Sequence, residues 1–490
     1  MTLEALTRGM PGLIAYHGDA SLEIAALSAD SRQRVEDGLF FCISGARVDA
    51  HLFAAQAVEH GCVALLVERH LPHLAVPQVE VSDVRAAMAR VSAAFFGWPA
   101  QALKLLGVTG TKGKTTTSYL LKAICERAGY RCGLIGTTGN MIGDQMLHGD
   151  LTTPDPIDMQ RTLRQMVDAG VEVVAMEVSA HALALRKLEG MCFEAAVYTN
   201  LSQDHLDFFH TMENYRDAKR LFFSRERARN AAYNADEETS QAMREGQDIP
   251  AITYGIRENC DLYARDIEIS ETGVSFVLNL NGLHSVPVNL RLTGMFNVYN
   301  ALAAAAAALI LGVELPVIQQ GLESVSSVPG RVEMLDTHTP YRVILDYSHV
   351  PDALENILRT VRDFTRGRLI VLFGCGGDRD QGKRPIMGRI GGKLADFCIL
   401  TSDNPRREDP FAILASIEEG IRETDAHYVV IESRREAIRY ALNMAREGDV
   451  LVLAGKGHET YQEIQGVKHP FDEKVIVGEL LHENEASQGE

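Results

Sequence analysis

One glycine-rich stretch, residues 107–117, constrains the fold of this chain more than any other feature. The apolar residues 105–108 before it predict a buried strand, and residues 115–127 after it carry apolar side chains at helical spacing. A strand, a glycine turn and a helix in this order form a phosphate-binding loop, where backbone N–H groups, the helix N-terminus and one lysine converge on anionic oxygens. The stretch therefore predicts an α/β fold with a nucleotide site.

The loop departs from the usual form of this motif at one position. A glycine is usual five residues before the Gly-Lys pair, but Val108 holds that position. The alternative is a strand–helix turn that binds no ligand. Lys114 and the hydroxyl of Thr115 favour a phosphate site, because the lysine of such loops contacts the phosphates and the hydroxyl binds a magnesium ion. The candidate loop residues are Gly110, Thr111, Lys112, Gly113, Lys114, Thr115 and Thr116.

The composition excludes several classes of protein. The chain has 66 acidic and 48 basic residues and a formal net charge of −18, which argues against a nucleic-acid partner. No run of 18 apolar residues occurs, so no membrane-spanning segment is expected. The eight cysteines form no C-x-x-C pair, and we expect them to be reduced thiols of a cytoplasmic protein.

The length of 490 residues and the order of the predicted elements indicate three α/β domains. Residues 1–100 alternate short apolar strands with helices. Residues 101–328 hold the phosphate loop in a mostly parallel sheet, with an antiparallel insertion expected at residues 261–294. In residues 329–490 the strand–helix alternation is regular and predicts a parallel, doubly wound sheet.

Three residues outside the loop have the chemistry of a metal or catalytic site. Glu177 follows an apolar strand, where its carboxylate could complete the coordination of a magnesium ion held by Thr115. His205 lies in a polar loop after another strand, and a structural role is the alternative there. Lys219 lies on a helix whose other face is apolar, so the residues alone favour a solvated surface lysine.

The C-terminal domain carries polar clusters after its strands. Residues 403–406 place a carboxylate, an amide and a guanidinium in one turn, a set that suits a zwitterion. The alternative is an Asx-Pro turn with a surface arginine. The other polar candidates in this domain are Asp346, Arg379, Lys383, Arg384, Lys456, His458 and Glu459.

Taken together, these motifs resemble those of the Mur ligases across all three domains. The matching segments include the phosphate loop, Glu177-Val-Ser-Ala-His181, Thr199 to Asp207, Asn297-x-x-Asn300, Gly330-Arg331 and Asp403-Asn-Pro-Arg406. The chain departs from the family where Lys112 stands for a frequent Asn and Lys187 for a common Arg. The Asp-Asn-Pro-Arg pattern is that of family members that add diaminopimelate rather than lysine.

The resemblance implies a fold and a reaction. The fold is an N-terminal UDP-binding α/β domain, a central P-loop mononucleotide-binding domain and a C-terminal Rossmann-like doubly wound domain. The implied reaction adds meso-2,6-diaminopimelate to the D-Glu γ-carboxylate of UDP-N-acetylmuramoyl-L-alanyl-D-glutamate, through an acyl phosphate made with ATP, in peptidoglycan precursor synthesis. A lysine-adding ligase of the same family, a folylpolyglutamate-type ligase and a nucleotide-binding scaffold are the alternatives.

The resemblance also implies roles for the central residues. Two Mg²⁺ ions and a CO₂-derived carbamate on Lys219 accompany ATP, which reverses the interpretation of Lys219 as a solvated lysine. The implied catalytic residues are Lys114, Lys219 and His205, and the metal ligands are Thr115, Glu177, His205 and carbamylated Lys219. The implied ATP contacts are residues 110–116 with Asn297, Arg331 and Asp346.

Substrate sites outside the loop follow from the same resemblance. The turn around Ser31, which by itself indicates a capping turn, then becomes part of the UDP-sugar site. The residues implied for the UDP-sugar dipeptide are Ala29, Ser31, Ala46, Arg47, Val48, Thr152, Thr153, Ser179, Leu185 and Lys187. Those implied for diaminopimelate are Arg379, Asp403, Asn404, Pro405, Arg406, Gly455 and Glu459. We expect a monomer with these small-molecule substrates as its partners.

Overall fold

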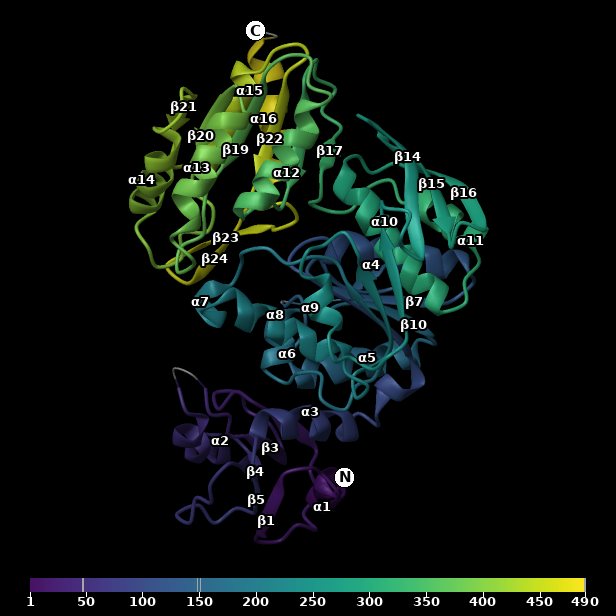
Figure 1. Cartoon of the computed structure of the whole chain (residues 1–490). Coiled ribbons are helices and arrows are strands. Elements are labelled where there is room, and N and C mark those ends of the chain that lie inside the picture. Colours follow the sequence, from purple (N-terminus) through teal and green to yellow (C-terminus); the bar gives the residue numbers. More distant parts are fainter. Residues whose placement is uncertain (46–47, 148, 150, 489–490) are drawn as a thin grey trace.

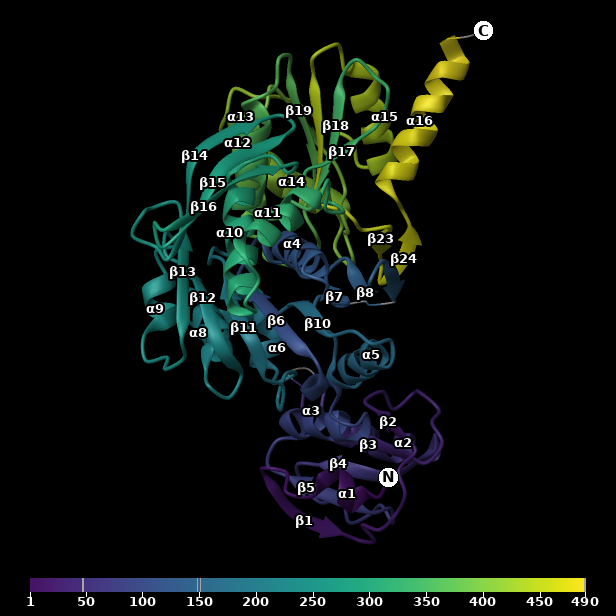
Figure 2. The same ribbon diagram turned by 90° about the vertical axis from the view of Figure 1, so that its right-hand side faces the viewer.

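The computed structural model describes residues 1–45, 48–147, 149 and 151–488. These residues form three α/β units stacked in chain order, with the N-terminal unit at one end and the C-terminal unit at the other (Figures 1 and 2). Each unit has its own sheet and its own core. The finer boundaries at residues 100 and 328 remain a prediction.

The N-terminal unit is a sheet of order β1-β5-β4-β3-β2, parallel except for β1. Helices α1 and α3 cover one face and α2 covers the other, as their buried apolar residues show. Its strands are β1 (Leu13–His17), β2 (Ala26–Ser28), β3 (Gly38–Phe41), β4 (Cys62–Val67) and β5 (Gln78–Val81). Its helices are α1 (Leu3–Thr7), α2 (Ala54–Glu59) and α3 (Val84–Phe95), with 3-10 turns at Ala50–Phe53 and Pro99–Ala102.

The central sheet has the order β16-β15-β14-β13-β12-β11-β6-β10-β7-β8-β9 in the described part of the chain. The strands from β14 to β7 are parallel, and both edges are antiparallel. The strands are β6 (Lys104–Thr109), β7 (Cys132–Gly136), β8 (Gly139–Ile142), β9 (Gln145–Leu147), β10 (Val173–Glu177), β11 (Phe193–Tyr198), β12 (Ala228–Asn234), β13 (Ala251–Gly255), β14 (Leu262–Ser270), β15 (Gly273–Leu280) and β16 (His284–Leu290).

The residues predicted as an antiparallel insertion are antiparallel, but they are not separate from the main sheet. β14 pairs in parallel with β13, and β15 and β16 then extend the same sheet by antiparallel pairing. Val274, Phe276 and Leu278 are buried at period two because one face of β15 packs on the central core. The predicted antiparallel segment therefore forms one edge of the nucleotide-binding sheet.

Helices cover both faces of the central sheet. Leu106 belongs to the core under α4, α10 and α11, whereas its neighbour Leu105 belongs to the opposite core under α5 and α6. Alanine fills residues 303–308 of α10, all fully buried, so this helix can approach α4 closely. The helices are α4 (Lys114–Arg127), α5 (Pro156–Asp168), α6 (Ala180–Ala184), α7 (Leu206–Phe209), α8 (Met212–Arg220), α9 (Ser240–Arg244), α10 (Met295–Ile310) and α11 (Leu315–Ser324), with a 3-10 turn at Leu221–Phe223.

The C-terminal unit is doubly wound, as the sequence predicts. Its sheet has the order β17-β18-β22-β19-β20-β21, and only β17 is antiparallel. Helices α12, α13 and α14 cover one face, and α15 and α16 the other. The strands are β17 (Glu333–Leu335), β18 (Arg342–Asp346), β19 (Leu369–Phe373), β20 (Phe397–Leu400), β21 (His427–Val430) and β22 (Val450–Ala454), followed by the hairpin of β23 (Tyr461–Ile464) and β24 (Val467–Pro470). The helices are α12 (Pro351–Arg362), α13 (Lys383–Leu394), α14 (Pro410–Ile421), α15 (Arg434–Met444) and α16 (Glu473–Gln488).

The helices of the described residues include none that is long and apolar enough to cross a membrane.

Candidate active site

The phosphate loop follows β6 and leads into α4, in the strand–turn–helix order that the sequence predicts. Gly113 caps α4 with a left-handed backbone (φ +84°), and a Cβ there would overlap the amide oxygen of Asn300. The ammonium of Lys114 donates to the carbonyl oxygens of Gly110 (2.8 Å) and Thr111 (2.9 Å). Burial lowers the pKa of Lys114. The lysine is thus folded back over its own loop.

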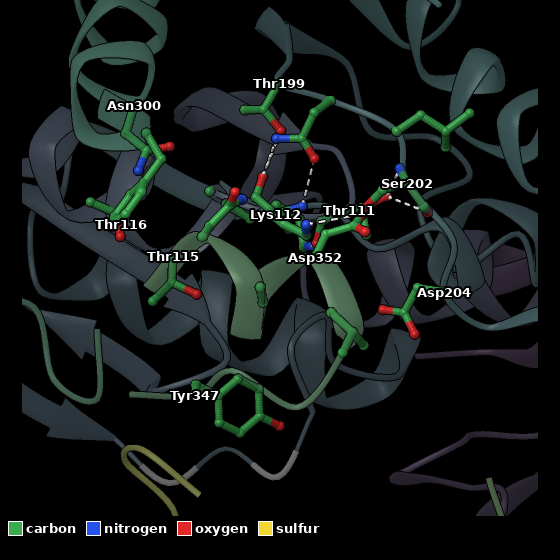
Figure 3. A pocket seen from close by; sticks show the side chains of 18 of the residues that line it. Thr111, Lys112, Thr115, Thr116, Thr199, Ser202, Asp204, Asn300, Tyr347 and Asp352 are labelled. Carbon is green, nitrogen blue, oxygen red and sulfur yellow. Dashed lines mark hydrogen bonds and ion pairs between the residues drawn. The ribbon is translucent and has the colours of Figure 1, made fainter. Parts of the chain in front are cut away.

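A cavity of about 730 Å³ lies over this loop, between the central and C-terminal units. Figure 3 shows its wall, with the loop residues Thr111, Lys112 and Thr115 facing Tyr347 and Asp352 of the C-terminal unit. The ammonium of Lys112 pairs with Asp352 at 3.2 Å across this interface. The cavity is therefore enclosed by two units of the chain, and neither unit forms it alone.

Thr115 and Glu177 are joined at the floor of the cavity. The Thr115 hydroxyl donates to Glu177 Oε2 at 3.1 Å and accepts from Arg331 at 3.0 Å. Glu177 is the last residue of β10 and fully buried, whereas the sequence suggested a position just past that strand. Thr137 also donates to its carboxylate, from the backbone N–H at 2.8 Å and from the hydroxyl at 3.0 Å. Two oxygen ligands and a guanidinium thus meet beside the loop.

Lys219 is buried, with 1% of its surface exposed, so its interpretation as a solvated helix lysine is wrong. Its ammonium lies 4.3 Å from the centre of the Tyr215 ring, and no hydrogen bond or ion pair reaches it within the described residues. Burial and the positive charge of Lys114 lower the pKa of Lys219 well below its usual value. It lines the same cavity as the loop.

His205 lies close to Lys219 in this cavity, with a left-handed backbone (φ +56°). Its ring stands edge-on to His181 at 4.6 Å, and its Nε2 lies 3.4 Å from the Asp204 carboxylate. Burial lowers the pKa of His205 to about 4, so the ring is neutral near pH 7 and offers a lone pair. Asp204 was not among the predicted site residues, although it directly precedes His205.

The residues predicted for ATP outside the loop divide into two groups. Arg331 and Asp346 line the cavity; burial raises the pKa of Asp346, which accepts from the backbone of Val332 at 2.8 Å. Asn297 lies outside the cavity lining and donates to a backbone carbonyl of its own unit. It accepts from Asn300 at 3.0 Å, and Asn300 is the residue of this motif that lines the cavity.

The residues predicted for the UDP-sugar dipeptide lie in two places. In the central unit, Thr152 and Ser179 line the cavity, while Thr153 is buried and bonds to the Glu177 carbonyl and to Ser179. Lys187 pairs with Asp155 at 2.8 Å, and Leu185 is the C-cap residue of α6. In the N-terminal unit, Ala29 and Val48 are exposed and Ser31 donates to Gln56. Ala46 and Arg47 lie outside the described residues.

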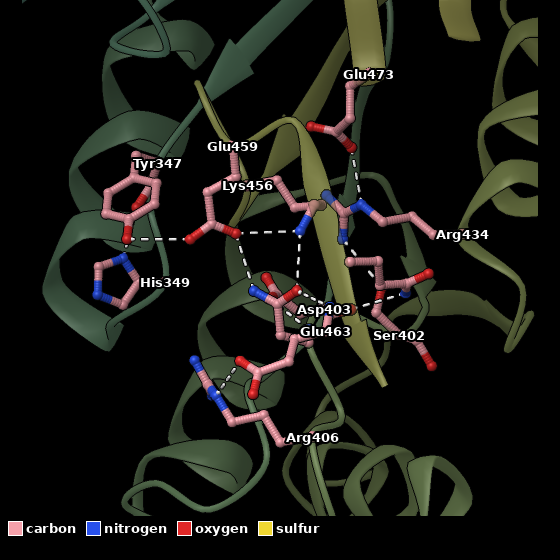
Figure 4. Close-up of polar contacts among 12 residues, drawn as sticks. Tyr347, His349, Ser402, Asp403, Arg406, Arg434, Lys456, Glu459, Glu463 and Glu473 are labelled. Carbon is pink, nitrogen blue, oxygen red and sulfur yellow. Dashed lines mark hydrogen bonds and ion pairs between the residues drawn. The ribbon is translucent and has the colours of Figure 1, made fainter. Parts of the chain in front are cut away.

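The turn at residues 403–406 forms the centre of a second polar group, which we call the Asp403 cluster (Figure 4). The amide oxygen of Asn404 accepts from Lys456 at 3.1 Å, and its nitrogen donates to Glu459 at 2.9 Å. Lys456, fully buried, also pairs with Glu459 at 3.1 Å. The cluster consists of Asp403, Asn404, Arg406, Lys456, Glu459 and Glu463.

Arg406 is not a free surface arginine. It adopts a left-handed backbone (φ +52°), donates from Nη1 to the Gly377 carbonyl at 2.8 Å and pairs through Nε with Glu463 at 3.2 Å. The hairpin of β23 and β24 fastens the whole turn, because Gln462 donates to the Asp403 carbonyl and the Arg406 backbone donates to Glu463. The alternative of a turn with a surface arginine is therefore wrong.

The remaining residues predicted for this site differ in position. Pro405 is buried in the turn, and Gly455 approaches the Asp403 carboxylate so closely that a Cβ would meet it at 2.6 Å. Arg379 is exposed, and its Nη1 donates to the carbonyl of its neighbour Asp378 at 3.4 Å. Tyr347 connects the two polar groups, because it lines the cavity and its hydroxyl donates to Glu459 at 3.4 Å.

Sequence reasoning missed several residues of this site. Glu463 and Thr137 carry no motif, so only their positions after folding reveal them. Lys456 was noted as a polar candidate but was given no role, although it lies in the Gly-Lys-Gly-His-Glu segment beside Glu459. That segment was the signal that could have found it.

The fold and the loop define a protein of the phosphate-loop class, with a second polar group beside the nucleotide cavity. Comparisons with known proteins specify the family. A model of the Mur ligase middle domain matches residues 108–308, and a model of the Mur ligase glutamate ligase domain matches residues 330–457. The chain belongs to the Mur ligase family, as the sequence motifs predict, and its three-domain α/β fold agrees with that membership.

Two individual relatives are similar over 99% of this chain. UDP-N-acetylmuramoyl-L-alanyl-D-glutamate--2,6-diaminopimelate ligase of Geobacillus thermodenitrificans (strain NG80-2) is 46% identical over 490 residues, 99% of this chain and 100% of the relative. A solved structure of a ligase with the same name has a TM-score of 0.69 at 33% identity and covers 99% of both chains. Folylpolyglutamate synthase of Mycobacterium tuberculosis covers 76% of this chain and 93% of its own, with a TM-score of 0.64, but at 16% identity it shows the fold alone.

Proposed function

We propose that this chain uses ATP to join meso-2,6-diaminopimelate to the D-Glu γ-carboxylate of UDP-N-acetylmuramoyl-L-alanyl-D-glutamate, a step of peptidoglycan precursor synthesis. The observation that carries the proposal is the 46% identity, over the full length of both chains, to a relative of that name. The position of the Asp403 cluster beside the nucleotide cavity supports it.

The proposed reaction has two steps. A γ-carboxylate oxygen attacks the γ-phosphorus of ATP; the new P–O bond gives an acyl phosphate, and the bond to ADP breaks. The amine of diaminopimelate then attacks the acyl carbon, and the tetrahedral intermediate loses phosphate and the amine loses its proton. Lys114 and the N–H groups of the loop stabilise the negative charge on the transferring phosphoryl group.

The residues at the floor of the cavity fit a magnesium site. Thr115 and Glu177 already place two oxygens 3.1 Å apart, and the neutral ring of His205 offers a nitrogen to a second ion. Among the described residues no group of three or more His, Cys, Asp or Glu side chains could bind a metal. In the proposed site the Thr115 hydroxyl and a modified Lys219 would add to the oxygen ligands of Glu177. Bound Mg²⁺ would neutralise phosphate charge.

Lys219 fits a carbamate. Burial and the positive charge of Lys114 lower the pKa of Lys219, which favours the uncharged amine that reacts with CO₂, and the ammonium has no ionic partner to displace within the described residues. The nitrogen would add to the carbon of CO₂ and release one proton, which converts a buried amine into an anion with two oxygen ligands. A ¹³C resonance from labelled CO₂, or a mass increase of the intact protein, tests this directly.

The choice of amino acid is proposed to rest on Arg406. Diaminopimelate carries a carboxylate at its far end where lysine has none, and the Nη2 group of Arg406 has no partner within the described residues. A carboxylate there would gain a charge-assisted hydrogen bond from Nη2, whereas lysine would leave that nitrogen without a partner. Asp403 and Glu459 would receive the ammonium of the same zwitterion.

A substrate panel tests the function. Purified protein receives the UDP-sugar dipeptide, ATP, Mg²⁺ and one amino acid, and ADP release is measured. We expect release that depends on meso-diaminopimelate and is weak with L-lysine. Equal or faster release with L-lysine would favour the lysine-adding alternative, and release that depends on a folate and L-glutamate would favour the folylpolyglutamate alternative.

Location and oligomeric state remain proposals of the same kind. We expect the chain to fractionate with the cytoplasm and to elute as a monomer. Light scattering at the working concentration, and activity in soluble and membrane fractions, test the two expectations.

A further inference from the structure

Two fully buried charged residues, Arg434 and Glu473, lie behind the Asp403 cluster (Figure 4). Arg434 is the first residue of α15 and Glu473 the first of α16, and Nε donates to Oε1 at 2.8 Å. The second carboxylate oxygen of Glu473 has no partner in the described part of the chain. Because a buried pair loses much of its attraction to desolvation, the pair is weak evidence for stability and calls for another explanation.

The other nitrogens of Arg434 connect two strands that are not neighbours. Nη2 donates to the carbonyl of Ala454 at 2.9 Å, at the end of β22, and Nη1 to the carbonyl of Ser402 at 3.4 Å, just after β20. In the sheet β19 lies between β22 and β20, so no ladder of hydrogen bonds joins those two strands. The guanidinium spans the gap.

Both strand ends lead directly into the Asp403 cluster. Ser402 precedes Asp403, and Ala454 precedes Gly455 and Lys456. The Asp403 carboxylate lies against Gly455, so the spacing of the two strand ends determines how the cluster is arranged. Burial alone would raise the pKa of Asp403, but the positive charges of Lys456 and Arg434 outweigh it and lower the pKa.

Other contacts besides this pair also dock α16 against α15. Ile476, Val477 and Leu480 of α16 pack with α15 in an apolar core. An exposed pair between the same helices, Arg435 and Glu479 at 2.7 Å, adds a further contact. A role in holding the helices together is therefore already filled.

We propose that Arg434, oriented by Glu473, is a positioning residue for the amino-acid substrate: it sets the distance between the ends of β20 and β22 and thereby aligns Asp403 with Lys456. Arg434 does not touch the substrate itself. The inference rests on the proposed function, because it assigns the Asp403 cluster to the amino acid.

A paired substitution separates positioning from stability. Changing Arg434→Met together with Glu473→Met removes both charges at similar volume, so no unpaired charge is left buried. The matched control is Arg435→Met with Glu479→Met, an exposed pair between the same two helices. For each protein the Tm is measured, together with KM for meso-diaminopimelate, for ATP and for the UDP-sugar dipeptide.

We expect the buried double variant to keep a Tm near that of the unchanged protein but to raise KM for diaminopimelate about tenfold, because a misaligned Asp403 would weaken one charged hydrogen bond to the amino acid. KM for ATP and for the UDP-sugar dipeptide should stay within about twofold. The exposed control should leave all three KM values unchanged. An unaltered KM for diaminopimelate, or an equal rise in all three, would overturn the inference.

A second variant tests the same inference if the double variant does not fold. Arg434→Lys keeps the charge, but one ammonium cannot reach Glu473 and both carbonyls, so a smaller rise confined to KM for diaminopimelate is expected. No rise in that folded variant would also reject the inference. If the unchanged protein shows no diaminopimelate-dependent ADP release, the proposed function fails instead.

Discussion

The phosphate loop and the Asp403 cluster reach their geometry by different means. The loop is seven consecutive residues, 110–116, of which the first four lie between β6 and α4 and the last three begin α4, and its own backbone holds Lys114 in place. The cluster takes residues from the ends of β20 and β22 and from the β23–β24 hairpin, and these residues hold one another by side-chain hydrogen bonds. A substitution elsewhere in the protein disturbs a geometry fixed by the backbone less than one fixed by a network of side-chain hydrogen bonds. We therefore expect loop substitutions to affect the chemical step, and cluster substitutions to affect amino-acid affinity.

The largest expected effect is that of Lys219→Ala. If Lys219 carries the proposed carbamate, its loss should lower kcat about a thousandfold or more, because a metal ion held there would contribute several kcal/mol to phosphoryl transfer. Short carboxylic acids should restore part of the activity by filling the space of the missing side chain. Arg216→Ala, on the same helix but half-buried and paired with Asp217, serves as the control. Full activity of the Lys219 variant without added acid would contradict the carbamate.

Lys114→Ala tests the expectation that substitutions in the phosphate loop affect the chemical step. We expect kcat to fall by a factor of about 10² to 10³, the cost of losing one charged donor to the transferring group. Lys112→Ala is the matched control, because that lysine pairs with Asp352 instead and should change kcat far less. A Lys114 variant with normal kcat and raised KM for ATP would show that the loop only binds, and the comparison would then fail.

A substitution of Arg406 tests the expectation that changes in the Asp403 cluster affect the affinity for the amino acid. Arg406→Ala should raise KM for meso-diaminopimelate roughly 10- to 100-fold, the cost of a charge-assisted contact, and leave KM for ATP unchanged. The preference of the variant for meso-diaminopimelate over L-lysine should also become smaller. Steady-state ADP release with both amino acids provides the measurement, and an undiminished preference for diaminopimelate would remove Arg406 from the specificity argument.

Gly113→Ala examines the backbone of the loop. Its left-handed conformation and the overlap with Asn300 should cost about 1–3 kcal/mol of unfolding free energy and raise KM for ATP. Gly129→Ala has a similar φ (+90°) but open space around the Cβ, so it should cost less and leave KM for ATP unchanged. Denaturant unfolding compares the two, and equal losses would mean that the contact with Asn300 has no role.

The smallest effect is expected for Glu463→Gln. The pair with Arg406 is partly solvated, with side chains 20% and 26% exposed, so losing its charge should change stability by less than about 1 kcal/mol. Thermal unfolding measures this change. A loss of several kcal/mol would mean that the hairpin depends on this pair to dock, and the cluster would then be more rigid than the comparison assumes.

Much of the fold was predictable because it follows from local patterns. The strand predicted at residues 105–108 is β6 (Lys104–Thr109) and the helix predicted at residues 115–127 is α4 (Lys114–Arg127), so the bounds differ by at most one residue. The antiparallel edge of the central sheet was predicted as an insertion. Alternation of apolar and polar residues along β15 indicates a strand with one buried face, but it does not indicate which sheet the strand joins. The order of the eleven strands in the described chain could not be derived from the sequence either.

The parts of the candidate site that are formed by residues close together in the sequence were the most predictable. Lys114 and Thr115 follow from a strand, a turn and a helix, and the turn at residues 403–406 follows from its own composition. The sequence predicted Asn297 as an ATP contact, but Asn300 is the residue of the same motif that lines the cavity. The packing of α10 on α4 decides which of the two side chains faces the cavity, and the motif alone does not show it.

The sequence by itself determined the phosphate loop, the order of the elements and the residue types that can carry phosphoryl and amide chemistry. Only the tertiary structure decided that Lys219 is buried rather than solvated, and that Arg434 joins two strands with a third between them. The physical reason is that backbone conformation depends mainly on neighbours in the chain. Desolvation and ion pairing depend on which distant segments come together when the chain folds.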